Sequence, residues 1–221
     1  MTAETPAIAR KTLVTMLLDG SPSMDEILPE TIDAVNGSLK KLGESSGDMM
    51  LTIRKFHSVG RFNGARTETL REAAAPRDIS PITIGEYGLS GWTPLYDAIL
   101  TIVRAIEQTV ADRPDISVCL VIQTDGKNND SCASADEVRR VIAEKTAQGW
   151  EINFLGCGID AYADQERTGL DAAKTVSYGT GSNEIRHALL ATAENIAAYS
   201  EGRMQSTAYS AHQKLMSGDV R

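Results

Sequence analysis

The sequence predicts an α/β fold with a mostly parallel sheet. Two continuous apolar runs, residues 13–18 and 116–122, have the length and composition of strands buried on both faces. Short apolar segments of this kind alternate along the chain with segments whose apolar residues recur at helical spacing. Each of the two long runs also ends in an aspartate and a glycine, which places polar loops at the carboxyl edge of the predicted sheet.

The first strand is expected over residues 12–18. A helix is predicted over residues 24–42, because its apolar residues keep helical spacing and Gly43 is placed to end it. Ser23 and Glu26 have the spacing of a capping box at the start of this helix.

The segment that follows is the least regular. A second strand is expected over residues 49–56, and residues 67–71 are a candidate third strand at the sheet edge. Several glycines and prolines interrupt the rest of residues 60–92, which we expect to form a long surface loop. Loops of this length within a compact domain are often functional.

Regular patterns return at Thr93. This residue is a suitable N-cap and Pro94 a suitable first residue for a helix that runs to about residue 111. The second apolar run, residues 116–122, then forms a strand. Ser134 and Glu137 fit another capping box. The remaining elements are expected as a helix over 134–148, a strand over 151–155, a helix over 161–173, a strand over 175–178 and a helix over 183–199 capped by Ser182.

The chain of 221 residues fits one domain over residues 11–202, with a polar lead-in at 1–10 and a polar tail at 203–221 that is expected to fray. The net charge of −8 argues against a nucleic-acid partner. No segment has the length of a membrane span, and no signal peptide is visible. These features favour a cytoplasmic protein without a membrane partner.

The cysteines and histidines do not indicate a disulfide framework or a zinc site. Cys119, Cys132 and Cys157 are an odd number without paired spacing, and Cys119 lies within an apolar run as a small core residue would. The histidines are scattered without ligand-like spacing; they are His57, His187 and His212.

Three loops bring together the residues of a candidate metal site. The first carries Asp19, Ser21 and Ser23, the second carries Thr93, and the third carries Asp125. If the first strand and the 116–122 strand are neighbours, these side chains flank the crevice where parallel sheets bind ligands. Two carboxylates held close repel each other, and a hard divalent cation would relieve that repulsion. Mg²⁺ suits this oxygen set, with Mn²⁺ and Ca²⁺ as alternatives.

Two further aspartates lie near this set in sequence. Asp97 is expected to support the start of its helix, where negative charge is favourable. Asp130 is expected to lie in a surface loop.

This pattern resembles a von Willebrand factor A (vWA) domain with a metal-ion-dependent adhesion site (MIDAS). That family combines Asp-x-Ser-x-Ser with a threonine and an aspartate on three loops, matched here by Asp19, Ser21, Ser23, Thr93 and Asp125. The resemblance covers residues 11–200. It implies a Rossmann-like, doubly wound, six-stranded sheet with one antiparallel edge strand and helices on both faces. The small size and unpaired cysteines resemble the stand-alone cytosolic vWA proteins of bacteria and their phages.

The resemblance implies a protein-binding module and not an enzyme. Ser21, Ser23 and Thr93 would bind the cation directly, Asp19 and Asp125 partly through water, and a partner's Asp or Glu carboxylate would fill the open position. Trp92, beside Thr93, is the candidate rim contact, unless its side chain folds inward over the helix.

Two alternatives have other consequences. A metal-dependent phosphatase of the haloacid-dehalogenase type would need an acid at position 21, where this chain has serine. A scaffold, whose metal only stabilises the loops, would keep its partners in chelator.

Overall fold

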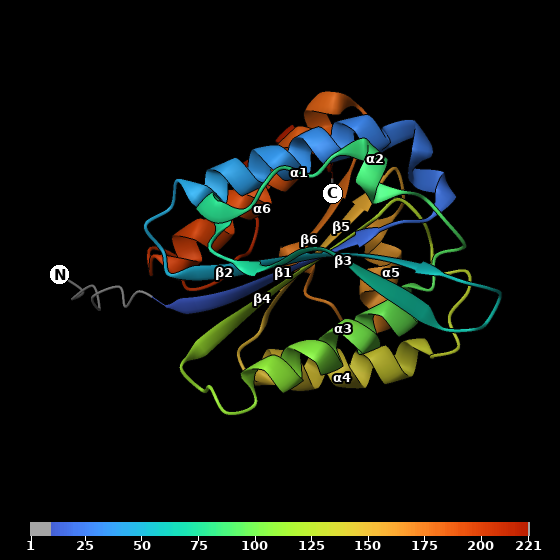
Figure 1. The fold of residues 1–221 in the computed structure, drawn as a ribbon, viewed down its shortest axis with the longest axis horizontal. Coiled ribbons are helices and arrows are strands. Elements are labelled where there is room, and N and C mark those ends of the chain that lie inside the picture. Colours follow the sequence, from blue (N-terminus) through green and yellow to red (C-terminus); the bar gives the residue numbers. More distant parts are fainter. Residues whose placement is uncertain (1–9, 221) are drawn as a thin grey trace.

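The structure is a computed structural model that describes residues 10–220. Its sheet has the strand order β3-β2-β1-β4-β5-β6, in which β3 runs antiparallel to β2 and every other pair of neighbours is parallel (Figure 1). The strands are β1 (Lys11–Asp19), β2 (Met49–Ser58), β3 (Ala65–Ala74), β4 (Ile116–Thr124), β5 (Glu151–Cys157) and β6 (Thr175–Tyr178). The predicted six-stranded sheet with one antiparallel edge strand is therefore confirmed.

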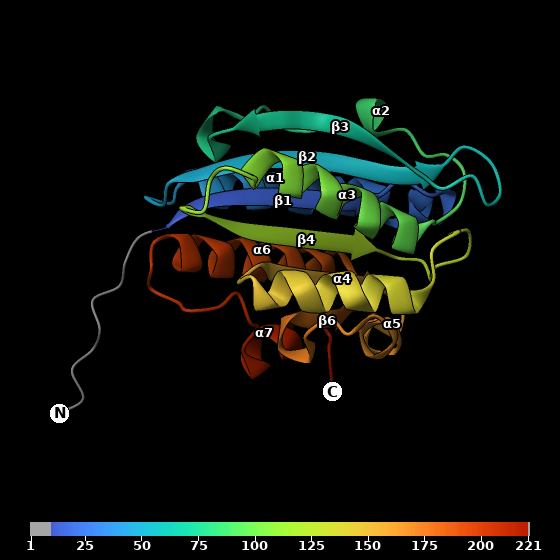
Figure 2. The ribbon, with the colours of Figure 1, turned by 90° about the horizontal axis from the view of Figure 1, so that it is seen from below.

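Helices cover both faces of the sheet. Figures 1 and 2 show α1 and α6 on one face and α3 and α4 on the other. The α-helices are α1 (Leu28–Gly43), α2 (Ile84–Tyr87), α3 (Leu95–Val110), α4 (Ala135–Ala147), α5 (Ala161–Thr168), α6 (Ser182–Ser200) and α7 (Ala211–Met216). Short 3-10 helices are η1 (Pro22–Ile27), η2 (Pro76–Asp78) and η3 (Ala172–Lys174).

Strand β1 carries apolar side chains on both of its faces. Val14, Met16 and Leu18 pack into the core beneath α1 and α6. Leu13 and Leu17 point to the opposite face and pack with α3. Because side chains alternate across a strand, only a strand covered on both sides needs apolar residues of both parities.

Several helix starts differ from the predicted ones. Residues 22–27 form η1 before α1 begins, and the Ser23 hydroxyl donates to Asp125 instead of capping the helix. Pro94 is the N-cap of α3, one residue beyond the predicted cap. Ser182 is the first residue of α6, not its cap. The capping box of Ser134 and Glu137 is confirmed.

Two segments are more regular than their sequence suggests. The edge strand β3 extends well beyond the predicted 67–71, and α2 interrupts the expected long loop. Strand β3 has no fully buried position, so it lacks the apolar signal that marks the other strands. The predicted helix over 161–173 ends at Thr168, because Gly169 adopts a left-handed conformation.

The C-terminal segment is not a frayed tail. Residues 207–219 pack against the β5–β6 side of the molecule, with Thr207, Tyr209 and Asp219 buried. Thr207 donates through its amide and its hydroxyl to Glu151, the first residue of β5. A polar composition therefore misleads here, because the polar atoms find buried partners on distant elements. The predicted lead-in at 1–10 lies, apart from Arg10, outside the described residues.

No helix within residues 10–220 is both long enough and apolar enough to cross a membrane.

Candidate metal centre

The candidate site lies at the carboxyl ends of β1 and β4. These strands are parallel neighbours, and Leu18 pairs with Gln123 in their register. Asp19 therefore ends β1 beside Thr124, and Asp125 follows directly. The carboxyl ends of neighbouring parallel strands flank the ligand crevice of an open α/β sheet.

Hydrogen bonds join the first and third predicted loops. The Ser23 hydroxyl donates to Asp125 Oδ1 over 2.9 Å, and the Ser21 and Ser23 Oγ atoms are 3.0 Å apart. Thr93, on the second loop, is buried. A Cβ added to Gly126 would lie 3.0 Å from Thr93 Oγ1 and 3.7 Å from Ser23 Oγ, so both hydroxyls lie beside the residue that follows Asp125. The structure thus brings Asp19, Ser21, Ser23, Thr93 and Asp125 to one place.

The Asp19 carboxylate is the most buried member of this set. It is fully buried, and both of its oxygens accept hydrogen bonds: Oδ1 from the Ser21 amide at 2.8 Å and Oδ2 from the Thr124 hydroxyl at 2.5 Å. Burial raises the pKa of Asp19 to about 6, against the lowering effect of the bonds from Thr124 and Ser21, and the Asp125 charge raises it further. Burial also raises the pKa of Asp125.

These observations fit a bound cation. No Lys, Arg or His within residues 10–220 forms an ion pair with Asp19 or Asp125. Two neighbouring carboxylates without a counter-charge are disfavoured in their ionised form, and a divalent cation would reverse that penalty. In the same part of the chain, no group of three or more His, Cys, Asp or Glu could hold a metal ion, so a cation here would also depend on hydroxyl ligands. Such an all-oxygen donor set suits hard cations.

Four supporting residues were not among the predicted site residues. Thr124 holds Asp19, and Tyr87, from α2, donates to the Asp19 carbonyl at 2.6 Å. The side-chain oxygen of Asn129 accepts a hydrogen bond from the Thr93 amide at 2.9 Å, and the backbone amide of Asn129 donates to the Thr93 carbonyl. Gly91 allows residues 91–93 to approach β2, since a Cβ there would lie 1.8 Å from the Ser58 carbonyl oxygen. In the sequence, Gly91 and Thr124 stand out only as neighbours of the predicted ligands Thr93 and Asp125, and Tyr87 and Asn129 give no signal.

Of the two aspartates near the site, Asp97 lies in the first turn of α3 as predicted, whereas Asp130 does not lie at the surface. The Asp97 carboxylate also accepts hydrogen bonds from the amides of Cys132 and Ala133, both at 2.8 Å, and so fixes the loop after β4 as well. Asp130 is 1% exposed, so its placement in a surface loop as a solvated residue is wrong. Its Oδ1 accepts the amide of Phe62, from the loop between β2 and β3, at 2.9 Å.

Trp92 does not fold inward. Its side chain is 42% exposed, and its backbone bonds to Ser58 through the Trp92 amide and carbonyl. The indole is therefore accessible to a partner beside the candidate metal site.

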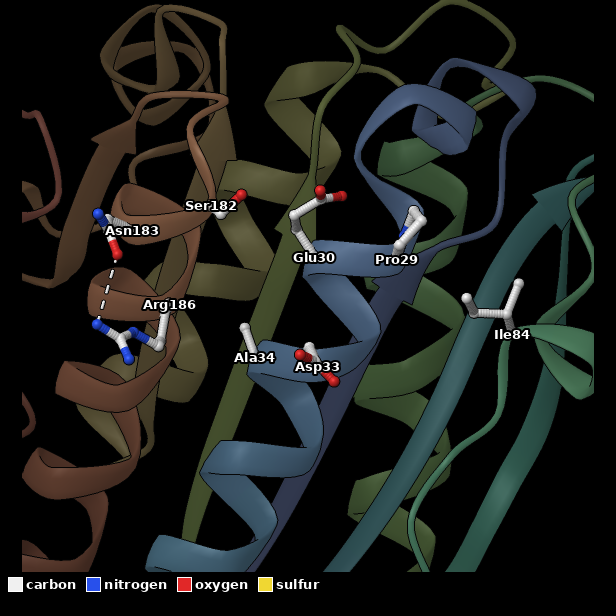
Figure 3. Close-up of a pocket in the computed structure, with 8 residues that line it drawn as sticks. All are labelled: Pro29, Glu30, Asp33, Ala34, Ile84, Ser182, Asn183 and Arg186. Atoms are coloured by element: carbon white, nitrogen blue, oxygen red, sulfur yellow. Dashed lines mark hydrogen bonds between the residues drawn. The ribbon is translucent and has the colours of Figure 1, made fainter.

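A separate hollow of about 510 Å³ lies between α1 and α6 (Figure 3). Figure 3 shows acidic residues of α1 and polar residues of α6 around it, and none of the five site residues lines it. Its lining residues are Pro29, Glu30, Asp33, Ala34, Ile84, Ser182, Asn183 and Arg186.

Comparison with solved structures finds the same fold at low sequence identity. The vWA2 paralog of ArnB from Sulfolobus acidocaldarius is 18% identical, with a TM-score of 0.56 over 84% of this chain and 46% of that one. Proximal thread matrix protein 1 from the mussel byssus, with a zinc-occupied MIDAS motif, is 12% identical, with a TM-score of 0.55 over 88% and 46% of the two chains. The pilus adhesin SpaC from Lactobacillus rhamnosus GG is 11% identical, with a TM-score of 0.64 over 86% and 30%. This chain thus spans about half or less of these proteins.

No match was found among curated proteins. The family model for the von Willebrand factor type A domain matches residues 14–178, which contain all five residues of the candidate site. The chain therefore belongs to the von Willebrand factor type A domain family.

Proposed function

We propose that this protein is a metal-dependent protein-binding module. The observation that carries the proposal is the pair of Asp19 and Asp125, held together with three hydroxyls and without a counter-charge within residues 10–220. Mg²⁺ is the first candidate for the cation, with Mn²⁺ and Ca²⁺ as alternatives.

Each residue has a distinct role in this proposal. Ser21, Ser23 and Thr93 would hold the cation directly, and Asp19 and Asp125 would do so partly through water. When bound, the cation supplies positive charge and an open position for an Asp or Glu carboxylate of the partner. Trp92 would add apolar contact area beside that carboxylate.

The known proteins with this fold support a binding role. One of the similar structures is a pilus adhesin and another is a byssus matrix protein whose MIDAS motif holds zinc. Position 21 supports the same reading. Because residue 21 is a serine, this position offers no carboxylic acid to protonate a leaving group. Its hydroxyl instead bonds to that of Ser23.

We also infer a cytoplasmic location. Cys119, Cys132 and Cys157 are all free thiols, and free cysteines are more common in a reducing compartment than in secreted domains.

Calorimetry with Mg²⁺ and melting curves with Mg²⁺ or chelator test the metal site. The wild type should gain about 2.7 kcal/mol at a hundredfold excess of Mg²⁺ over its dissociation constant. Asp125→Ala and Thr93→Val should lose this gain, and Asp112→Ala, at an exposed aspartate, should keep it. An equal gain in all variants would place the cation elsewhere and refute the proposal.

Turnover is measured on the same samples. We expect no Mg²⁺-dependent hydrolysis of p-nitrophenyl phosphate or nucleotides above background. Hydrolysis that Asp19→Asn abolishes would instead support the phosphatase alternative.

A further inference from the structure

Three exposed apolar side chains lie on two neighbouring loops beside the candidate metal site. Val59 and Phe62, in the loop between β2 and β3, are 62% and 59% exposed, and Trp92 is 42% exposed. The Ser58 amide and hydroxyl bond to the Trp92 backbone, so this loop lies beside residues 91–93. Figures 1 and 2 show the β2–β3 loop at the same end of the molecule as the loop that follows β4. We call Val59, Phe62 and Trp92 the apolar rim.

The conformation of Phe62 is unusual. Its φ of 55° makes it the only non-glycine residue within 10–220 with a positive φ. A left-handed conformation costs a bulky residue about 1–2 kcal/mol, so surrounding contacts must maintain it. Placing a large aromatic ring in solvent by means of a strained backbone is unfavourable for the isolated protein. Such a combination points to a use in binding.

The contacts that hold Phe62 come from the loop that also carries Asp125. The Phe62 amide donates to the buried Asp130 carboxylate at 2.9 Å, and Cys132 Sγ lies 2.9 Å from the Phe62 carbonyl oxygen. Asn129, one residue before Asp130, bonds to the Thr93 backbone. One loop therefore fixes the position of Phe62 relative to two of the proposed metal ligands.

The charge beside the rim suits an acidic partner. The Arg61 guanidinium lies 5.6 Å from the centre of the Phe62 ring and is exposed. The chain as a whole carries a net charge of −8. The positive charge of Arg61 beside the candidate metal site therefore favours the approach of a negatively charged segment at this place.

We propose that the apolar rim is the docking surface for an acidic segment of a partner protein that carries a bulky apolar side chain close to its metal-binding Asp or Glu. This inference rests on the proposed function, since it assumes that a partner carboxylate reaches the metal edge. The carboxylate contact alone would discriminate poorly between acidic partners. An adjacent apolar contact would add both affinity and sequence preference.

An array of short synthetic peptides tests this surface. Each peptide contains one Glu in a Gly/Ser background, with Leu, Phe or Ser at one nearby position, and has a Gln counterpart. Wild-type protein is bound in Mg²⁺ and in chelator. We expect Mg²⁺-dependent retention of Glu peptides with Leu or Phe over their Ser counterparts. Phe62→Ala and Val59→Ser should reduce that preference roughly tenfold while Mg²⁺ affinity measured by calorimetry is unchanged.

Matched controls separate the rim from general surface effects. Met216→Ala removes a large exposed side chain on α7, away from the β2–β3 loop in sequence, and should keep the full preference. Asp130→Asn keeps an acceptor for the Phe62 amide and should retain the preference better than Asp130→Ala does.

The outcomes distinguish the two proposals. If Glu peptides bind in Mg²⁺ without any preference for Leu or Phe, or if the preference survives in Phe62→Ala, the rim inference is wrong and the metal-dependent function stands. If no Glu peptide is retained in Mg²⁺ over its Gln form, although calorimetry shows that Mg²⁺ binds, the rim inference fails together with the carboxylate mechanism. If Mg²⁺ does not bind, the metal site itself is refuted.

Discussion

The Thr124 hydroxyl donates a 2.5 Å hydrogen bond to Asp19 Oδ2, so the residue before one proposed ligand holds the carboxylate of the other. Both residues are fully buried. Because β1 and β4 are adjacent and parallel, this bond fixes the carboxyl ends of the two central strands relative to each other.

Replacing Thr124 with valine should weaken both the fold and the metal site. The substitution preserves the side-chain shape but leaves a buried carboxylate oxygen without its donor, which costs about 1–3 kcal/mol of unfolding free energy. The same loss should raise the pKa of Asp19 further and weaken Mg²⁺ binding. Urea denaturation in chelator and calorimetry with Mg²⁺ measure the two effects.

Thr109→Val is the matched control, because Thr109 bonds only to the Ala105 carbonyl on an exposed part of α3. Its stability should change by less than about 0.5 kcal/mol. Equal effects of the two substitutions would show that the Thr124 bond has no special importance.

The absence of a side chain at Gly126 leaves room beside the hydroxyls of two proposed ligands, Thr93 and Ser23. An added Cβ would lie 3.0 Å from Thr93 Oγ1 and 3.7 Å from Ser23 Oγ. Gly126→Ala should therefore weaken Mg²⁺ binding roughly tenfold without removing any ligand. Gly37→Ala, where the nearest atom is 3.8 Å away, should leave Mg²⁺ affinity unchanged. Unchanged affinity in Gly126→Ala would mean that Thr93 and Ser23 do not hold the cation.

The order and type of the central elements could be predicted, whereas contacts between distant polar residues could not. Strands β1 and β4 carry apolar residues on both faces because both faces are covered, and that composition is visible in the chain. The five candidate ligands could be proposed because four of them lie at or just after the ends of predictable strands, and Thr93 lies just before a predictable helix. Whether they bind a metal is still a prediction.

The unpredicted features share one physical cause, which is that their signal lies in a distant part of the chain. Thr207 is polar in a polar segment, and only its contacts with distant residues such as Glu151 and Asn153 explain its burial. In the sequence Asp130 looks like a solvated loop residue, and only its contact with the Phe62 amide explains why it is buried. Strand β3 is half-exposed at the sheet edge, so its side chains carry little hydrophobic pattern.

Gly91 should not tolerate any side chain. Its φ is 69°, and an added Cβ would lie 1.8 Å from the Ser58 carbonyl oxygen. Gly91→Ala should lower the unfolding free energy by more than about 1–2 kcal/mol, because the clash adds to the cost of the left-handed conformation. Gly85→Ala, where an added Cβ meets nothing within 4 Å, is the control in chemical denaturation. Two variants of equal stability would contradict the close approach of residues 91–93 to β2.

Glu151 links the sheet to the C-terminal segment, and its titration should make that link dependent on pH. Its carboxylate accepts the Thr207 amide at 2.8 Å and forms a 2.9 Å ion pair with Lys174. Burial alone would raise the pKa of Glu151, but the bonds from Thr207 and Lys174 lower it below its ordinary value of 4.5. Because the folded-state pKa is the lower one, the stabilisation is present above 4.5 and is lost as the pH falls through the folded value.

Glu151→Gln should therefore destabilise the protein at neutral pH and have little effect in acid. The amide can still accept from Thr207, but Lys174, 7% exposed, loses its closest counter-charge, which costs roughly 3 kcal/mol for a buried pair. Urea denaturation across the acidic range should show the wild-type and variant curves converging below pH 4.5, where the wild-type carboxylate becomes protonated. Glu26→Gln, at an exposed residue of η1, should follow the wild type throughout. A constant difference between wild type and Glu151→Gln at every pH would show that the ionised carboxylate does not hold the C-terminal segment on the sheet.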